Sequence, residues 1–270
     1  MAVGIGNQRV ALVDLKTEQP RRIIEKTDCA IAFEEEGRVL LTLSSNGLSR
    51  IQLSENRTSA PHQLEPPLRN FDVLGLSADH RLLVAENEPG QLSIWDLNVG
   101  RAIEKTTLPE GRRVTFLKFS PNNQQLAVLR ERAEDVLLYS HGLKNLRTLK
   151  KHALEAWSVA FSSDGSVMAT AAMDDRVILW RTDTFGVIAT LDGHKEGVFG
   201  VAFSPDNKTI AALCGNRSIK LWNVATRREV ANLPFNQVSA YVEFTPDGQT
   251  LIAHKPWPPG PRFEFWHTQR

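Results

Sequence analysis

Short apolar segments recur along the chain at nearly constant intervals, and each ends in an aromatic residue or in a residue that takes its place. The last residues of successive segments lie 39, 43, 44, 41, 42 and 44 positions apart. The segments are VALV (10–13), SRIQ (49–52), LSIW (92–95), VLLY (136–139), VILW (177–180), IKLW (219–222) and FEFW (263–266). A fixed period of this length indicates a repeat architecture, in which each repeat is one supersecondary unit.

A second landmark precedes each of the last six segments. It is an apolar alternation that runs into Ser, Thr, Pro, Asp, Asn or Gly, and it predicts a strand that ends in a tight turn. The landmarks are AIAFEEEG (30–37), LGLSADH (74–80), LKFSPNN (117–123), VAFSSDG (159–165), VAFSPDN (201–207) and VEFTPDG (242–248). An apolar run follows each turn, a weaker outer strand follows each aromatic segment except the last, which the chain ends after, and no long helical period interrupts them. Each repeat is therefore predicted to be four short strands.

A repeat of four strands cannot bury both of its faces alone. Repeats that stack around an axis can, and closing the stack also shortens the exposed sheet edges. We therefore predict an all-β fold, a β-propeller of four-stranded blades that occupies residues 1–270 as one domain.

Composition fits a folded chain and argues against nucleic acid as a partner. Hydrophobic residues make up 41 % of the chain and charged residues 23 %, close to the averages for globular domains. The 32 Lys and Arg residues against 31 Asp and Glu residues give a net charge of +1. This balance removes the overall electrostatic argument for binding nucleic acid or an anionic membrane.

Cysteine usage and the amino terminus favour a reducing compartment. Cys29 and Cys214 are the two cysteines, which is too few for a disulfide framework or a Cys-rich metal site, so both are expected to be small buried hydrophobes. The chain has no basic leader before a long apolar run and no stretch of about 18 apolar residues. We expect a cytoplasmic protein with no membrane span and no cofactor.

The sequence resembles the WD-repeat (WD40-type) β-propeller family over nearly its whole length. The resemblance rests on the spacing, on the FSPD-type turns, and on Trp95-Asp96, Trp180-Arg181, Trp222-Asn223, Trp266-His267 and Gly193-His194. It implies the same four-stranded blades that the pattern predicts.

The resemblance also implies a polar network that braces a blade. One repeat has the whole set: a His before the innermost strand, a Thr on the second strand, an Asp in the next turn and the Trp, which are His152, Thr170, Asp174 and Trp180. Satisfied hydrogen bonds explain these residues without chemistry. A hydrolase triad of His152, Asp174 and Thr170 is disfavoured, because its nucleophile would be locked inside a blade rather than placed in a cleft.

The following repeat departs from this set. His194 and Trp222 are in place, but Ala212 and Asn216 stand where the Thr and Asp would be. We expect that network to be broken.

The sequence allows three arrangements of the repeats that would close the ring of blades. Seven repeats with an incomplete first blade, which lacks its innermost strand, are favoured. Residues 21–26 can instead serve as the outer strand of the last repeat, which gives six complete blades. The chain can also be the carboxyl-terminal part of a longer repeat protein, since it begins in mid-repeat, and we expect further chain upstream of Met1.

Few residues suggest catalysis. The sequence lacks G-x-G-x-x-G, G-x-x-x-x-G-K-[ST], H-E-x-x-H and G-x-S-x-G, and its seven His residues do not cluster at ligand spacing. The carboxylate runs Asp174-Asp175 and Glu34-Glu35-Glu36 are expected to be solvated. Residues from several blades can still converge at a central channel, so a propeller enzyme with a metal or acid–base site there is the alternative to a binding protein.

Binding is favoured, because partners of WD-repeat proteins usually dock on the loops before the innermost strands and between the second and third strands. By this resemblance the rim positions are Thr27, Asn70, Arg113, Glu155, Gly197 and Val238, with Met173 from the other kind of loop. The set is chemically mixed and names no ligand. We expect a non-catalytic scaffold that binds another protein or another domain of a longer parent chain, such as the kinases and signalling modules to which similar bacterial chains are often fused.

Two further tryptophans lie outside the repeated aromatic segments, and each has an expected packing or binding role. Trp257 lies in the Pro-rich insert 254–266 and is either a partner anchor or a cover for the open end of the last blade. Trp157 is expected to pack between blades from an innermost strand.

Overall fold

The computed structural model divides the chain into two compact units. The first contains residues 1–111 with 256–261, and the second contains residues 112–255 with 262–270. Within them the structure describes residues 2–6, 9–14, 19–25, 29–34, 38–44, 46–55, 57–68, 73–140, 142–235, 241–255 and 262–267.

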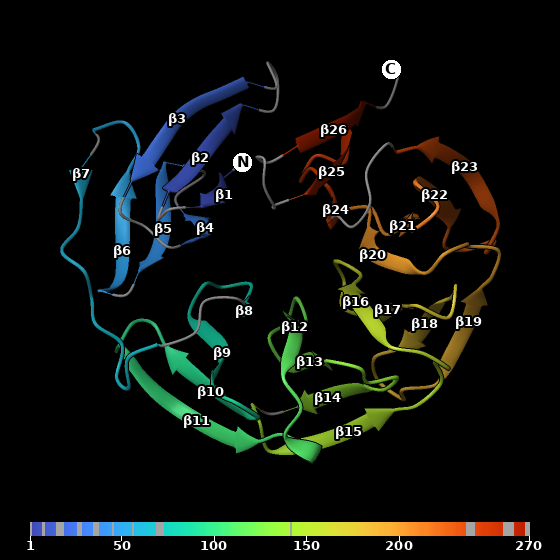
Figure 1. The fold of residues 1–270 in the computed structure, drawn as a ribbon, viewed down its shortest axis with the longest axis horizontal. Helices are drawn as coiled ribbons and strands as arrows, with labels where there is room; N and C mark the ends of the chain where they lie inside the picture. Colours follow the sequence, from blue (N-terminus) through green and yellow to red (C-terminus); the bar gives the residue numbers. More distant parts are fainter. Residues whose placement is uncertain are drawn as a thin grey trace. The chain divides into compact units, whose positions relative to one another are not determined.

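The first unit is built of three antiparallel sheets, each from strands consecutive in sequence (Figure 1). Sheet 1 contains β1 (Ala2–Gly6), β2 (Arg9–Asp14) and β3 (Gln19–Glu25). Sheet 2 contains β4 (Cys29–Glu34), β5 (Val39–Ser44), β6 (Gly47–Gln52) and β7 (Arg57–Thr58). Sheet 3 contains β8 (Leu74–Leu76), β9 (Leu82–Glu88), β10 (Gln91–Asp96) and β11 (Arg101–Thr107), and the 3₁₀ turn η2 (Pro109–Gly111) follows it.

The second unit repeats the arrangement in four sheets. Sheet 4 contains β12 (Val114–Phe119), β13 (Gln125–Arg130), β14 (Val136–Ser140) and β15 (Asn145–Leu149). Sheet 5 contains β16 (Ala156–Phe161), β17 (Val167–Ala172), β18 (Val177–Arg181) and β19 (Val187–Leu191). Sheet 6 contains β20 (Val198–Phe203), β21 (Thr209–Cys214), β22 (Ser218–Asn223) and β23 (Glu229–Pro234). Sheet 7 contains β24 (Tyr241–Phe244), β25 (Thr250–Lys255) and β26 (Arg262–His267).

The prediction of an all-β fold in four-stranded propeller blades is confirmed. Sheets 2 to 6 each have four strands that pair in sequence order, and sheets 1 and 7 have three described strands each. A three-stranded sheet 1 agrees with an incomplete first blade. Residues 21–25 lie in β3, which pairs with β2 inside sheet 1.

Hydrophobic cores form between successive sheets, because the middle strands are apolar on both faces while the outer strands are largely exposed. Leu129 and Leu138 of sheet 4 pack with Val159 and Trp180 of sheet 5 in one such cluster. Equivalent clusters join sheets 5 and 6, 6 and 7, 1 and 2, and 2 and 3. A side chain that projects from one sheet is therefore held by the next, as the repeat argument requires.

The tight turns between first and second strands share one hydrogen-bonding pattern. In sheet 5 the Ser162 hydroxyl donates to Asp164 Oδ1 at 2.6 Å and accepts the Val167 N–H at 2.9 Å. The same pattern recurs at Ser77–Asp79, Ser120–Asn122, Ser204–Asp206 and Thr245–Asp247. Each turn also has a positive φ three residues after the hydroxyl, at His80, Asn123, Gly165, Asn207 and Gly248. Only Gly, Asn, Asp and a few other residues adopt this conformation cheaply, which explains why the landmarks in the sequence end in Asn and Gly.

In the second unit, a β-bulge interrupts the pairing near the start of three first strands. The extra residues are Thr115 in β12, Trp157 in β16 and Phe199 in β20. Bulges at a sheet end redirect a side chain away from the ladder, so these three residues leave the alternation of their strands beside the loops that precede them.

Candidate functional site

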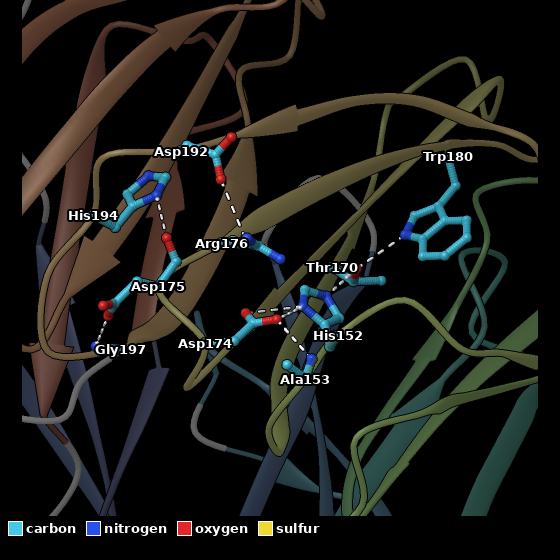
Figure 2. A network of polar contacts seen from close by, with 10 residues as sticks. All are labelled: His152, Ala153, Thr170, Asp174, Asp175, Arg176, Trp180, Asp192, His194 and Gly197. Atoms are coloured by element: carbon cyan, nitrogen blue, oxygen red, sulfur yellow. Dashed lines mark hydrogen bonds and ion pairs between the residues drawn. The ribbon is translucent and has the colours of Figure 1, made fainter.

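His152, Thr170, Asp174 and Trp180 form a continuous chain of hydrogen bonds in sheet 5 (Figure 2). Trp180 Nε1 donates to Thr170 Oγ1 at 2.9 Å, and the Thr170 hydroxyl lies 2.7 Å from His152 Nε2. His152 Nδ1 lies 3.1 Å from both carboxylate oxygens of Asp174, which also accepts the Ala153 N–H. Because Thr170 accepts from Trp180, its own proton is available to His152 Nε2, and Nδ1–H then donates to Asp174.

This arrangement holds a neutral imidazole. Burial lowers the pKa of His152, and the neighbouring Asp174 carboxylate opposes that shift without reversing it. Thr170 is fully buried, and its hydroxyl accepts one hydrogen bond from Trp180 and donates one to His152. The four residues therefore brace the blade and the loop before β16, and they present no accessible nucleophile.

The expectation of a broken network at His194 was half wrong. The Thr and Asp are absent, but His194 keeps two partners of a different kind: Trp222 Nε1 donates directly to His194 Nε2 at 3.0 Å, and His194 Nδ1 donates to the Asp175 carbonyl oxygen at 3.2 Å. The small Ala212 leaves Trp222 free to meet the imidazole. Burial lowers the pKa of His194 as well.

The prediction that Asp174 and Asp175 are solvated is wrong. The Asp174 side chain is 5 % exposed inside the network. Asp175 Oδ1 accepts the Gly197 N–H at 2.6 Å, which ties the turn after β17 to the loop before β20 (Figure 2). The Asp174 side chain is buried and Asp175 is half-buried, and backbone donors from two loops satisfy both carboxylates. In the other run, Glu34 pairs with Arg50 at 2.8 Å.

Several predicted rim residues meet in the second unit. Met173 N donates to the Glu155 carbonyl at 2.9 Å, and Met173 Sδ lies over Gly197, where a Cβ would come within 2.9 Å of the sulfur. Glu155 Oε1 accepts the Arg132 N–H at 2.5 Å, while Arg113 is exposed and its carbonyl accepts the Glu131 N–H. Thr27, Asn70, Val238 and Trp257 lie outside the described residues. We call the loops 112–113, 131–135, 152–155, 173–176, 195–197 and 215–217 the rim.

The rim of the second unit also carries an aromatic pair that the loop-based assignment left out. Trp157 and Phe199 meet edge to face, with ring centroids 4.8 Å apart and planes at 80°. The contact joins sheets 5 and 6, as expected for Trp157, yet 39 % of Trp157 remains exposed. Phe199 lies against the rim at Gly215, where a Cβ would come within 2.8 Å of its ring. The bulges bring both rings to the rim, and no sequence pattern marks a bulge in advance.

Other predicted features of the chain are ordinary structural contacts. Asp96 of the Trp-Asp pair accepts both Nε and Nη2 of Arg81, and Trp95 Nε1 donates to the Pro66 carbonyl at 3.0 Å. Cys214 is buried, as predicted. No three His, Cys, Asp or Glu side chains among the described residues are placed to hold a metal ion. In the same part of the chain, no helix has the length and apolar character needed to cross a bilayer.

The repeated sheets, their hydroxyl turns and the His–Thr–Asp–Trp network resemble those of WD-repeat proteins. The comparison with known families agrees: residues 143–181, which run from β15 to β18, and residues 185–223, which run from β19 to β22, match WD40, "WD domain, G-beta repeat". The predicted resemblance to WD-repeat β-propellers is thereby confirmed.

Curated relatives extend the similarity beyond these two repeats. The mouse protein "Target of rapamycin complex subunit LST8" is 22 % identical over 204 residues, which are 71 % of this chain and 62 % of that protein. "Telomerase protein component 1" of the mouse is 26 % identical over 188 residues, 66 % of this chain and 7 % of that protein. "Small ribosomal subunit protein RACK1y" of Oryza sativa subsp. japonica is 35 % identical over 121 residues, 43 % of this chain and 35 % of that protein. The chain thus matches less than two thirds of the length of the LST8 proteins.

Proposed function

We propose that this chain is a non-catalytic scaffold that binds another protein, or another domain of a longer parent chain, through the rim of its second unit. Trp157 and Phe199 are the anchor, and Arg113, Glu155 and Met173 are the further partner-binding positions on this rim. The sequence also predicts Thr27, Asn70 and Trp257 as partner-binding positions; they belong to the first unit, lie outside the described residues and stay predictions. Signalling proteins, including kinases, are the expected partner class.

The observation that carries the proposal is the aromatic pair of the exposed Trp157 and the half-buried Phe199 beside the hydrogen-bonded loops of the rim. Large aromatic side chains dominate the binding energy at protein interfaces, and they lose little conformational freedom when they bind. Here the loops around them are already fixed by contacts such as Glu155 to Arg132 N and Asp175 to Gly197 N. Because these loops are already fixed, the rim loses less conformational entropy when a partner binds, and this favours affinity.

The relatives support an assembly role. The LST8 proteins are named as subunits of a complex and RACK1y as a ribosomal subunit protein. The hydrogen-bonded roles of His152, Thr170 and Asp174 support a structural rather than catalytic use of the best polar cluster.

The test is quantitative capture of partners by the tagged full chain from cells that contain it. Trp157→Ala is compared with Val187→Ala, a matched control, because Val187 is 43 % exposed on the outer strand β19. We expect proteins retained by the wild type and by Val187→Ala to fall at least about tenfold with Trp157→Ala, since aromatic anchors typically contribute 2 kcal/mol or more. Identical retention by all three chains, with equal unfolding midpoints, would exclude the rim as the binding surface.

A further inference from the structure

The segment that precedes sheet 3 pairs with the outer edge of β11 at a single residue. β11 is the outermost strand of its sheet, and among the described strands it pairs with β10 alone (Figure 1). Glu65 N donates to the Gly100 carbonyl at 2.7 Å, and Ala102 N donates to the Glu65 carbonyl at 2.7 Å. This is the bonding of a parallel strand. It cannot continue, because the next donor on the segment would be the N–H of residue 67, which is Pro67.

The same edge repeats this arrangement of backbone groups further along β11. Leu108 N donates to the Gly90 carbonyl at 2.7 Å at the hairpin that joins β10 to β11. Bonded and non-bonded pairs alternate along an antiparallel ladder, so Thr106 is the next residue of β11 to bond with β10. Lys105 and Thr107 therefore direct their backbone groups away from β10. Between them they offer a carbonyl and an N–H, as the parallel bridge uses at the start of the strand.

Sheet 6 agrees that the N–H at the Thr107 position points away from its own sheet. Pro234 ends β23 opposite Ser218, the first residue of β22, just as Thr107 ends β11 opposite Gln91. Proline is accepted in a strand where no ladder hydrogen bond needs its nitrogen. In sheet 3 the same position keeps its N–H, and Thr107 is exposed.

A cleft of about 270 Å³ lies beside this edge, within the first unit. Its lining includes Pro66, where the segment leaves β11, together with Gln91, Ser93, Ile103 and Lys105. Ser93 lies opposite Lys105 on the ladder and two residues from Gln91, so these three side chains share one face of the sheet. Ile103 is 53 % exposed. The cleft thus has room for a side chain of an added strand, with apolar surface at Ile103.

Gln91 indicates which side chain would fit. Its Oε1 atom is buried and has no hydrogen-bond partner among the described residues. A buried acceptor without a donor is unfavourable. The terminal torsion of a glutamine is soft, so this amide can turn to meet an N–H donor in the cleft.

We propose that β11 binds an extended peptide segment of a partner protein as an added parallel strand between Lys105 and Thr107, with a glutamine or asparagine side chain in the cleft. The paired peptide residue donates its N–H to the Lys105 carbonyl and accepts the Thr107 N–H. The amide of a neighbouring peptide residue donates to Gln91. Strand addition to an exposed edge is a recurring mode of peptide recognition. The edge belongs to the first unit and is separate from the rim anchor, so the proposal does not depend on the proposed function.

The test is an NMR titration of the ¹⁵N-labelled full chain with the capped peptide Ac-Ser-Gln-Val-Gln-Ser-amide. We expect the largest amide shifts at Thr107 and its neighbours. The same peptide with an N-methylated central Val lacks the N–H that the Lys105 carbonyl would accept. It is expected to bind at least about tenfold more weakly, as for loss of a hydrogen bond together with a steric clash at the edge.

Variants of the chain test the two kinds of contact separately. Thr107→Pro removes the donor N–H, as Pro234 does in sheet 6, and is expected to weaken binding at least about tenfold while the urea unfolding midpoint stays unchanged. Thr107→Ala is the matched control, since it keeps the N–H, and it is expected to bind like the wild type. Gln91→Met removes the acceptor in the cleft and is expected to weaken binding at least about threefold.

Binding unchanged by N-methylation, by Thr107→Pro or by Gln91→Met would overturn the proposal. Absence of amide shifts at about 5 mM peptide, enough to detect a millimolar affinity, would also overturn it. A dimer in solution that Thr107→Pro dissociates would place a second copy of the chain on this edge, and would overturn the assignment to a partner peptide.

Discussion

At the scale of single residues, hydrogen-bond direction explains the roles of both buried histidines. His152 and His194 each use Nε2 as an acceptor and Nδ1–H as a donor, although their partners differ. Protonation would convert Nε2 of His194 into a donor that faces the donor Nε1–H of Trp222. A proton on this ring therefore costs a hydrogen bond in addition to the burial of a charge.

Stability is expected to fall as the solution is acidified. The pKa values of His152 and His194 are lowered by burial from 6.5, so the unfolded chain takes up protons first. Stability is fully present above the unfolded pKa and declines as the pH falls below it toward the folded pKa values. Urea unfolding at about pH 7.5, 6.5 and 5.5 measures this decline.

The control separates histidine from the turn carboxylates. Hydrogen bonds lower the pKa values of Asp164 and Asp206 from 3.8. The stability that these two carboxylates contribute is therefore lost only at lower pH, below the range of about pH 7.5 to 5.5. His194→Gln keeps an acceptor for Trp222 and removes one titrating group, so its loss of stability over the same window is expected to be smaller. A pH dependence as steep as that of the wild type would contradict the assignment.

The sequence predicted the His152 network well and the His194 contacts poorly, for a physical reason. The first depends on four polar residue types at fixed offsets, which a sequence displays. The second depends on the small side chain of Ala212, which leaves room for Trp222 to reach the imidazole directly. Space of this kind is a property of packing, and so is the burial of the Asp174 side chain.

At the scale of elements, the hydroxyl turns fix where each first strand ends and each second strand begins. The sequence displays these turns because they need particular residues at particular φ values. It does not display the bulges at Trp157 and Phe199, since almost any residue can occupy them. The turns were therefore predictable, whereas the aromatic pair at the rim was not.

Removing one turn hydroxyl is expected to cost about 1–2 kcal/mol of unfolding free energy, because the turn carboxylate loses its donor and a backbone N–H loses its acceptor. Ser162→Ala makes this change, since Ser162 contacts Asp164 and Val167. Thr148→Ala on the exposed outer strand β15 is the control and should change stability by less than about 0.5 kcal/mol. Denaturant titration measures both, and equal effects would show that the turn hydrogen bonds contribute nothing.

At the scale of the whole molecule, near-neutral charge limits the kinds of partner. The net charge is +1, and the rim of the second unit mixes both signs around its aromatic pair. Nothing in this balance favours long-range attraction to a polyanion. The net charge in the sequence offers no overall electrostatic argument for such partners, and finding the anchor at Trp157 required the structure.

Partner binding through the rim is therefore expected to depend weakly on salt. Affinity should fall less than about threefold between about 50 and 200 mM salt, whereas a protein that contacts many phosphates loses about a thousandfold or more. Titrations at several salt concentrations with the captured partner measure the slope. A steep slope would point to charged contacts in place of the aromatic anchor.

The hydroxyl turns have one more consequence, for how such a chain can lengthen. Ser204, Asp206 and Thr209 form these hydrogen bonds with one another within one turn of sheet 6. The polar groups that take part therefore have their partners inside the repeat itself. A duplicated copy would arrive with these bonds already made. Gene duplication can then add blades while selection acts mainly on the apolar faces that must fit their new neighbours.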